Sequence, residues 1–198
     1  AIKLGDDDEL ISVQFTTGHD ELMIASREGK CIRFSEEDVR PMGRDTQGVR
    51  AISLSEEDCL VDMLVIREES KVFTLTSNGF GKRTDVEEYR LQGRAGKGIK
   101  AGVFNEKTGW LVCMKVVGDD EDIMVISDNG TIIRMHASDV SVIGRDTQGV
   151  RIMRLKEAKV ASVAIAPRDD EEVEEGSEEP AEQPAEGENA AEETPSEE

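Results

Sequence analysis

The sequence GRDTQGVR occupies Gly43–Arg50 and returns with the same eight residues at Gly144–Arg151. A related sequence, GRAGKGIK, lies between them at Gly93–Lys100, so the steps along the chain are 50 and 51 residues. Internal periods of about 20 to 50 residues are typical of solenoids and propellers. The repeat therefore indicates an array of similar structural units.

A second repeated pattern precedes each glycine-rich motif. It consists of an apolar run, a polar turn containing glycine, and a second apolar run that ends near a basic residue. Glycine tolerates the positive φ of tight hairpin turns, and the turn glycines here are Gly29, Gly79 and Gly130. We predict β-hairpins over Ile24–Phe34, Leu75–Thr84 and Val125–Met135.

Short runs rich in valine, isoleucine and leucine follow each motif and predict two further strands per repeat. The first run is attached directly to the motif, at Val49–Leu54, Ile99–Phe104 and Val150–Leu155. The second lies at Asp58–Ile66, Gly109–Val117 and Lys159–Ala166. Four strands in about 50 residues predict an all-β, propeller-like array of antiparallel blades over residues 1–168, with no convincing helix.

The first fifteen residues, AIKLGDDDELISVQF, match the sequence AISLSEEDCLVDML that starts at Ala51. We therefore expect the chain to begin just after the glycine motif of an earlier repeat and to be a fragment of a larger array. An array cut between repeats exposes an unpaired sheet edge. We expect marginal stability or self-association of the isolated chain.

The net charge of −20 is concentrated near the C-terminal end. Residues 169–198 contain 15 acidic and no basic residues, whereas residues 1–168 have a net charge of −5. The acidic segment has no aromatic residue and one valine, so it cannot bury enough apolar surface to offset the entropy of ordering. We predict a disordered acidic tail at 169–198.

No run approaches the roughly 18 apolar residues of a membrane span, and no secretory leader is evident. Cys31, Cys59 and Cys113 stand singly in apolar surroundings and lack metal-ligand spacing. We predict that they are buried, reduced thiols. These features predict a cytoplasmic protein that makes no membrane contact.

The segments DVRPMGRDTQGVRAI (Asp38–Ile52) and YRLQGRAGKGIKAG (Tyr89–Gly102) resemble the repeats of the C-terminal domain of bacterial DNA gyrase A. The resemblance covers residues 1–168, and a free acidic tail is also usual in that family. It implies a six-bladed β-pinwheel, a propeller variant whose blades exchange strands, with this chain holding the C-terminal blades. It also implies that duplex DNA wraps around the basic outer rim.

The hallmark of that family is a seven-residue box, QRRGGKG, in the first blade. A similar motif here consists of Gln92, Gly93, Arg94, Ala95, Gly96, Lys97 and Gly98. Gly93 stands where the box has a basic residue, and Ala95 replaces a glycine. We interpret the motif as a degenerate box from a later blade.

DNA wrapping needs cations at regular intervals, because the duplex carries about one negative charge per 1.7 Å of its axis. The repeat supplies three series of cations: Arg44, Arg94 and Arg145; Arg50, Lys100 and Arg151; and Arg33, Arg83 and Arg134. The strongest predicted DNA contact is the segment between Tyr89 and Phe104, whose charged residues are Arg90, Arg94, Lys97 and Lys100. We expect backbone contact and DNA bending rather than base reading.

Several of these residues also have a structural interpretation. Arg44 and Arg145 precede aspartates, so bridges within the loop that lock the blades together are an equal alternative to DNA binding. Trp110 starts an apolar run and is predicted to lie in the core, whereas Tyr89 is a candidate for a sugar–phosphate contact. His19 and His136 have no partner at a telling spacing, so we predict no catalytic or metal site.

The predicted function is DNA binding and wrapping by a non-catalytic domain. The resemblance implies that the parent is an ATP-dependent type II topoisomerase that introduces negative supercoils. ATP and Mg²⁺ are then cofactors of the parent, with none for this fragment. The implied partners are double-stranded DNA, the gyrase B protein, and a second copy of the gyrase A protein.

Two alternatives to gyrase remain from the sequence. One is the C-terminal domain of the corresponding DNA-cleaving protein of topoisomerase IV. The other, from a different class, is a protein-interaction propeller, which the scarcity of aromatic anchors disfavours. The acidic tail is a candidate for contact with the basic rim, because tethered carboxylates compete with DNA at high effective concentration.

Overall fold

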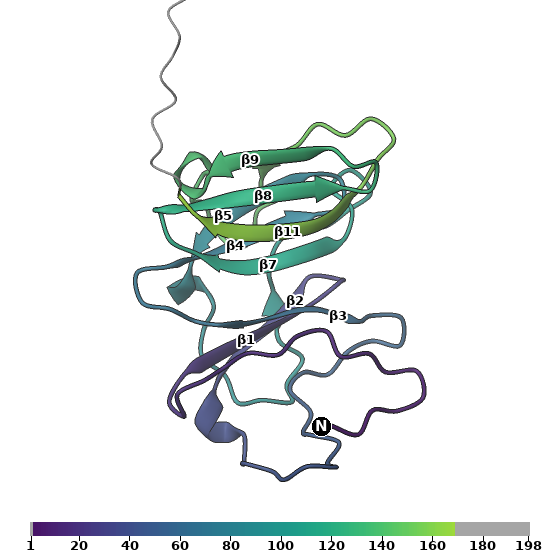
Figure 1. The fold of residues 1–198 in the computed structure, drawn as a ribbon, viewed down its shortest axis with the longest axis vertical. Coiled ribbons are helices and arrows are strands. Elements are labelled where there is room, and N and C mark those ends of the chain that lie inside the picture. The colour runs from purple at the N-terminus through teal and green to yellow at the C-terminus, as the bar shows by residue number, and fades with distance from the viewer. Residues whose placement is uncertain (1, 169–198) are drawn as a thin grey trace, which may run out of the picture. The chain divides into compact units, whose positions relative to one another are not determined.

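The computed structural model describes residues 2–168, which form three antiparallel β-sheets of four, four and three strands. Figure 1 shows the first sheet around β1 to β3, and the other two sheets stacked beyond it. The prediction of an all-β array of small antiparallel sheets is confirmed. The prediction of a disordered tail at 169–198 lies outside the described residues.

Each sheet is built on a hairpin at the predicted place. The hairpins are β1 (Glu21–Ser26) with β2 (Lys30–Ser35), β4 (Lys71–Thr76) with β5 (Phe80–Asp85), and β8 (Glu121–Ser127) with β9 (Ile132–His136). The turn glycines Gly29, Gly79 and Gly130 all have positive φ, between 79° and 84°. Glycine adopts this conformation without a Cβ clash, so the turn chemistry decides where each hairpin reverses.

A third strand pairs with the first strand of each hairpin. These inner strands are β3 (Leu60–Val65), β7 (Leu111–Val117) and β11 (Val160–Pro167), which pair with β1, β4 and β8. β7 contacts both β3 and β11, and Figure 1 shows β11 and β7 side by side. The inner strands therefore join the three sheets.

The core lies between the sheets and follows the two-residue period of the strands. In β4, Val72 belongs to the cluster between the first and second sheets, and Phe73 to the cluster between the second and third. Both side chains are completely buried. The middle sheet thus buries both faces, which explains the nearly continuous apolar sequence of β7.

Two sheets receive a fourth strand from the next repeat. β6 (Ile99–Lys100) pairs with β2, and β10 (Val150–Arg151) pairs with β5. This is the strand exchange that the resemblance implied. The predicted six-residue strands were nevertheless too long, because the chain leaves each sheet edge after two residues.

Val49–Leu54 and the segment Leu10–Phe15 form no strand, although they align with strands of the later repeats. Ile52 makes one isolated bridge, to Gly96. Their partners would belong to a hairpin that lies before β1 and β2 in the sequence, and residues 2–17 contain no hairpin. Leu10, Val13 and Phe15 are consequently exposed.

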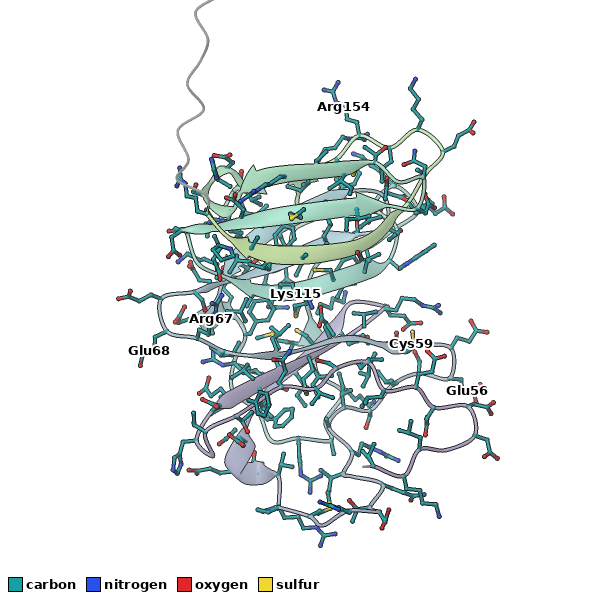
Figure 2. All side chains as sticks on the ribbon, in the orientation of Figure 1. Glu56, Cys59, Arg67, Glu68, Lys115 and Arg154 are labelled. Atoms are coloured by element: carbon teal, nitrogen blue, oxygen red, sulfur yellow. The ribbon has the colours of Figure 1, made fainter. Side chains whose placement is uncertain are left out.

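Smaller differences from the prediction occur elsewhere. Three short 3-10 helices, at Glu36–Asp38, Val86–Glu88 and Ala137–Asp139, follow the outer strands of the hairpins. Cys31 and Cys113 are buried free thiols as predicted, but Cys59 is exposed because it lies in the turn before β3 (Figure 2). Within residues 2–168, no helix is both long and apolar enough to cross a membrane.

Candidate nucleic-acid interface

Of the three glycine-rich segments, two lie along the outer edges of sheets, opposite the inner strands. We call residues 43–48, 93–98 and 144–149 the first, second and third glycine loops. The second glycine loop covers β2: the Gln92 N–H donates to the Arg33 carbonyl at 2.8 Å, and the Ala101 N–H donates to the Gly29 carbonyl at 2.8 Å. This loop therefore forms the outer edge of the first sheet.

The third glycine loop covers β5 with the same pattern. The Ile143 N–H donates to the Arg83 carbonyl at 2.9 Å, and the Ile152 N–H donates to the Gly79 carbonyl at 2.9 Å. Gly149 has a φ of 82°, and a Cβ on it would overlap the carbonyl oxygen of Gly81. Close backbone approach is therefore one reason for glycine at this position.

Seven of the ten predicted DNA-binding residues are exposed. They are Arg44, Arg50, Arg90, Lys97, Lys100, Arg134 and Arg151. All except Arg134 lie on a glycine loop or within three residues of one. A long anion that follows the glycine loops would therefore meet cations from every repeat.

Arg94 and Arg145 connect successive repeats. The Arg94 guanidinium donates to the carbonyls of Arg50, at 3.1 Å, and Asp38, at 3.0 Å. The Arg145 guanidinium donates to the carbonyl of Lys100, the residue that corresponds to Arg50. Arg145 also pairs with Asp146. Each arginine thus fastens its own glycine loop to the end of the preceding motif. The structural interpretation expected this of Arg145, whereas Arg94 was predicted to bind DNA.

The third predicted series of cations is engaged within the fold. Arg33 pairs with Glu21 and donates to the carbonyls of Val86 and Tyr89. Arg83 is 5 % exposed and donates to the carbonyls of Val140 and Ser138 and to Asp119. Arg134 pairs with Asp122, whose pKa His136 and Arg134 hold below its usual value. A phosphate would have to displace these partners.

Lys82 is a buried cation that the sequence did not single out. It is 2 % exposed, and its Nζ donates to the carbonyls of Gly144 (3.1 Å), Arg145 and Thr147 (3.1 Å) and to the Thr147 hydroxyl (3.3 Å). Burial lowers the pKa of Lys82 to about 8. These hydrogen bonds from the ammonium hold the third glycine loop in its conformation.

Tyr89 and Trp110 lie in surroundings opposite to those predicted for them. Tyr89 is completely buried, and burial raises the pKa of its phenol. Trp110 is 49 % exposed, and the Lys159 ammonium lies 5.9 Å from its ring centroid. The strand begins one residue later, at Leu111, so Trp110 lies in the loop rather than in the core.

Exposed arginines outside the predicted set include Arg40, which belongs to the repeated pattern, and Arg154, which does not. Arg40 lies 50 residues before Arg90 and has the same place in the repeat, a signal that was available in the sequence. Arg154 projects outward from the loop after β10 (Figure 2). Its repeat counterparts are Ser53 and Val103, so the period carried no signal for it.

The sequence matches the family described as "DNA gyrase C-terminal domain, beta-propeller" over residues 1–17, 20–67, 70–117 and 121–167. The DNA gyrase A protein of Staphylococcus epidermidis is 45% identical over 174 residues, which cover 86% of this chain and 20% of the relative. Its counterpart in Escherichia coli K12 is 47% identical over 157 residues, which cover 79% of this chain and 18% of the relative. The chain therefore spans about a fifth of these relatives.

Solved structures agree with the fold. A DNA gyrase A C-terminal domain aligns with a TM-score of 0.78 at 28% identity, over 83% of this chain and 57% of the other. The C-terminal domain of a DNA topoisomerase IV aligns with a TM-score of 0.80 at 23% identity, over 84% of this chain and 52% of the other. The second likeness supports the pinwheel fold alone.

Proposed function

Because the chain belongs to the DNA gyrase C-terminal domain family, we propose that it holds duplex DNA along the outer edges of its sheets. The observation that carries this proposal is the position of the exposed cations, which recur on or beside every glycine loop. Each can neutralise a phosphate and release a condensed counterion. The repeat would set them along a curve, so that binding bends the DNA.

The proposed contact residues are ranked by how free their side chains are. Lys97, Lys100 and Arg90 are exposed on the second repeat. Arg50 and Arg151 are the exposed counterparts of Lys100, and Arg44 is exposed on the first glycine loop. Arg94 and Arg145 use part of their guanidinium groups to hold the loops and would contribute with the remaining donors. Arg83 is left out because it is buried, and Arg134 ranks last because it pairs with Asp122.

The larger enzyme gives this binding its proposed role. In a gyrase, wrapped DNA would present a segment for ATP-dependent strand passage and negative supercoiling. The parent would act with Mg²⁺, the gyrase B protein, and a second copy of the gyrase A protein in the bacterial cytoplasm. The gyrase relatives favour this over the topoisomerase IV alternative.

The acidic tail is proposed as a competitor of DNA for the same cations. Its 15 carboxylates are tethered to the repeats, so they act at high effective concentration. Removing residues 169–198 should then raise DNA affinity at low salt. Equal affinity with and without the tail would refute this role.

The direct test is duplex binding across a salt series, with the full chain and with K97Q/K100Q. Loss of two phosphate contacts should weaken binding and make the slope of log affinity against log salt shallower by about 2. R154Q/K156Q removes the same charge from the exposed loop after β10 and serves as the matched control. Equal losses in both variants would mean that only net charge matters.

A further inference from the structure

A basic pocket lies beside the turn between β4 and β5, at the end of the edge strand β10. Its volume is about 220 Å³, and its walls include the exposed cations Lys107, Arg151 and Lys159 together with the ring of Phe80. The Lys107 ammonium lies 5.6 Å from the centroid of this ring, and the Arg151 guanidinium lies 4.9 Å from it. The three cations come from the loop before β7, from β10 and from the residue before β11. Tertiary structure therefore brings them together.

Asn78, in the turn between β4 and β5, connects two of these segments. Its Nδ2 donates to the carbonyls of Glu106, at 3.1 Å, and Lys107, at 3.0 Å. Its Oδ1 accepts a hydrogen bond from the Lys159 ammonium. The amide therefore fixes the loop that carries Lys107 and also the ammonium of Lys159. A neutral amide can position a cation, but it does not neutralise the charge.

The pocket has few carboxylates to balance its positive charge. Within residues 2–168, the three cations contact an aromatic ring or an amide, and none of them forms an ion pair. Glu157 is the one acidic residue in the described wall of the pocket, and it is exposed. The nearby Asp128 carboxylate accepts the backbone N–H of Lys159 at 3.0 Å. Cations held close together without a counter-ion repel one another and attract an anion to the space between them.

The equivalent place in the first sheet carries its own carboxylates. Glu28 stands where the second sheet has Asn78. The loop at 55–58 contains three acidic residues and no basic one, whereas its counterpart at 105–109 contains Lys107. The two sheets share the same hairpin and the same two-residue edge strand. The excess of positive charge is thus particular to the second sheet and is not required by the fold that both sheets share.

We propose that this pocket is a binding site for a phosphate group, held by Lys107, Arg151 and Lys159. The Arg151 guanidinium offers donors in a planar arrangement that matches phosphate oxygens, and the two ammonium groups add charge. The contact with Phe80 restrains the guanidinium beforehand, which reduces the entropy lost when an anion binds. The phosphate can belong to duplex DNA or to a free phosphorylated molecule. Only the first of these sources rests on the function proposed above.

The first test measures the binding of inorganic diphosphate to the full chain by isothermal titration calorimetry, at low salt and without divalent cations. The unmodified chain should bind diphosphate, and K107Q/K159Q should weaken this binding at least about tenfold, because two charge-assisted hydrogen bonds are lost. K97Q/K100Q removes the same charge from the second glycine loop and is the matched control. It should weaken binding less than about threefold, because only long-range attraction is lost. The proposal is wrong if the unmodified chain does not bind diphosphate, or if both variants lose equally.

The second test supplies the missing counter-ion without removing a cation. N78D places a carboxylate beside the Lys159 ammonium, so it should weaken diphosphate binding at least about fivefold. Urea unfolding of the same variant shows whether its fold is intact. Unchanged diphosphate binding by folded N78D would overturn the assignment of the site to these cations.

Duplex DNA distinguishes the two sources of the phosphate. If diphosphate competes with the duplex and K107Q/K159Q weakens duplex binding, the pocket holds a phosphate of DNA. If K107Q/K159Q loses diphosphate binding but keeps its affinity for the duplex, the pocket takes a free phosphorylated molecule. The K97Q/K100Q variant tests DNA binding at the second glycine loop by itself, so failure of the function proposed above is distinguishable from failure of this site.

Discussion

The octapeptide GRDTQGVR occurs twice with the same residues, and its two copies differ in structure. In both, the threonine hydroxyl donates to the carbonyl three residues earlier, from Thr46 to Gly43 and from Thr147 to Gly144. The following glycines have similar φ angles, 78° and 82°. However, Val150–Arg151 forms β10, whereas Val49 and Arg50 belong to no strand.

The comparison separates what the local sequence decides from what its neighbours decide. The threonine hydrogen bond is formed within the octapeptide, so both copies have it, although Asp45 has a positive φ of 61° and Asp146 does not. The strand needs a partner with free N–H and C=O groups, and only the second copy lies against one, β5. A strand of two residues has no independent stability, so its presence depends on tertiary contact.

The largest expected difference between the copies concerns their last glycine. Gly149→Ala should lower the free energy of unfolding by about 3 kcal/mol or more, because the added Cβ overlaps the Gly81 carbonyl. Gly48→Ala should lower it by about 1 kcal/mol, since only its positive φ is unfavourable. Urea unfolding of both variants measures the difference. Equal losses would show that φ strain alone matters at both sites.

The sequence predicted the hairpins and inner strands well because their signals are local. Turn glycines at fixed spacing and runs of valine and isoleucine are visible without any partner. The extent of β6 and β10 was not predictable in this way, because a neighbouring repeat determines where pairing stops.

The prediction of the cation series was limited in the same way by contacts between distant residues. The period placed Arg83 and Arg94 in series with other arginines, but it could not say which face each side chain takes. The exposed residues Arg50 and Lys100 and the engaged residues Arg83 and Arg94 carry the same sequence signal. Their difference arises from carbonyls that are more than 40 positions distant in the chain.

The second prediction uses Lys82, which contacts only the second copy. Burial lowers its pKa to about 8, although Glu88 and Asp146 oppose this shift, and the unfolded chain should have a pKa near 10.5. Between these values the unfolded chain binds more protons, so the free energy of unfolding should rise with pH. The rise should be on the order of 2 kcal/mol relative to K82M, measured by urea unfolding at pH 7.5 and 10. A parallel pH dependence in K82M would contradict the assignment.

A smaller effect is expected at the arginine of each copy. Arg145 donates to the Lys100 carbonyl and pairs with Asp146, whereas Arg44 is exposed. R145A should lower the free energy of unfolding by about 1 to 2 kcal/mol, and R44A should change it by less than about 0.5 kcal/mol. The measurement is chemical denaturation of both variants in the same buffer. Indistinguishable stabilities would remove the connecting role assigned to Arg145.

The smallest difference concerns the last residue of the octapeptide. The Arg151 guanidinium lies 4.9 Å from the ring centroid of Phe80, which is nearly buried, whereas Arg50 lies outside any strand. A cation over a phenyl ring contributes about 0.5 to 1 kcal/mol, so R151A should destabilise the chain by this amount more than R50A. The same ring also lies 5.6 Å from the Lys107 ammonium, which would partly replace the lost cation. A double-mutant cycle of R151A with F80L measures the contact alone. A coupling energy near zero would mean that only the strand pairing of β10 holds this end of the motif in place.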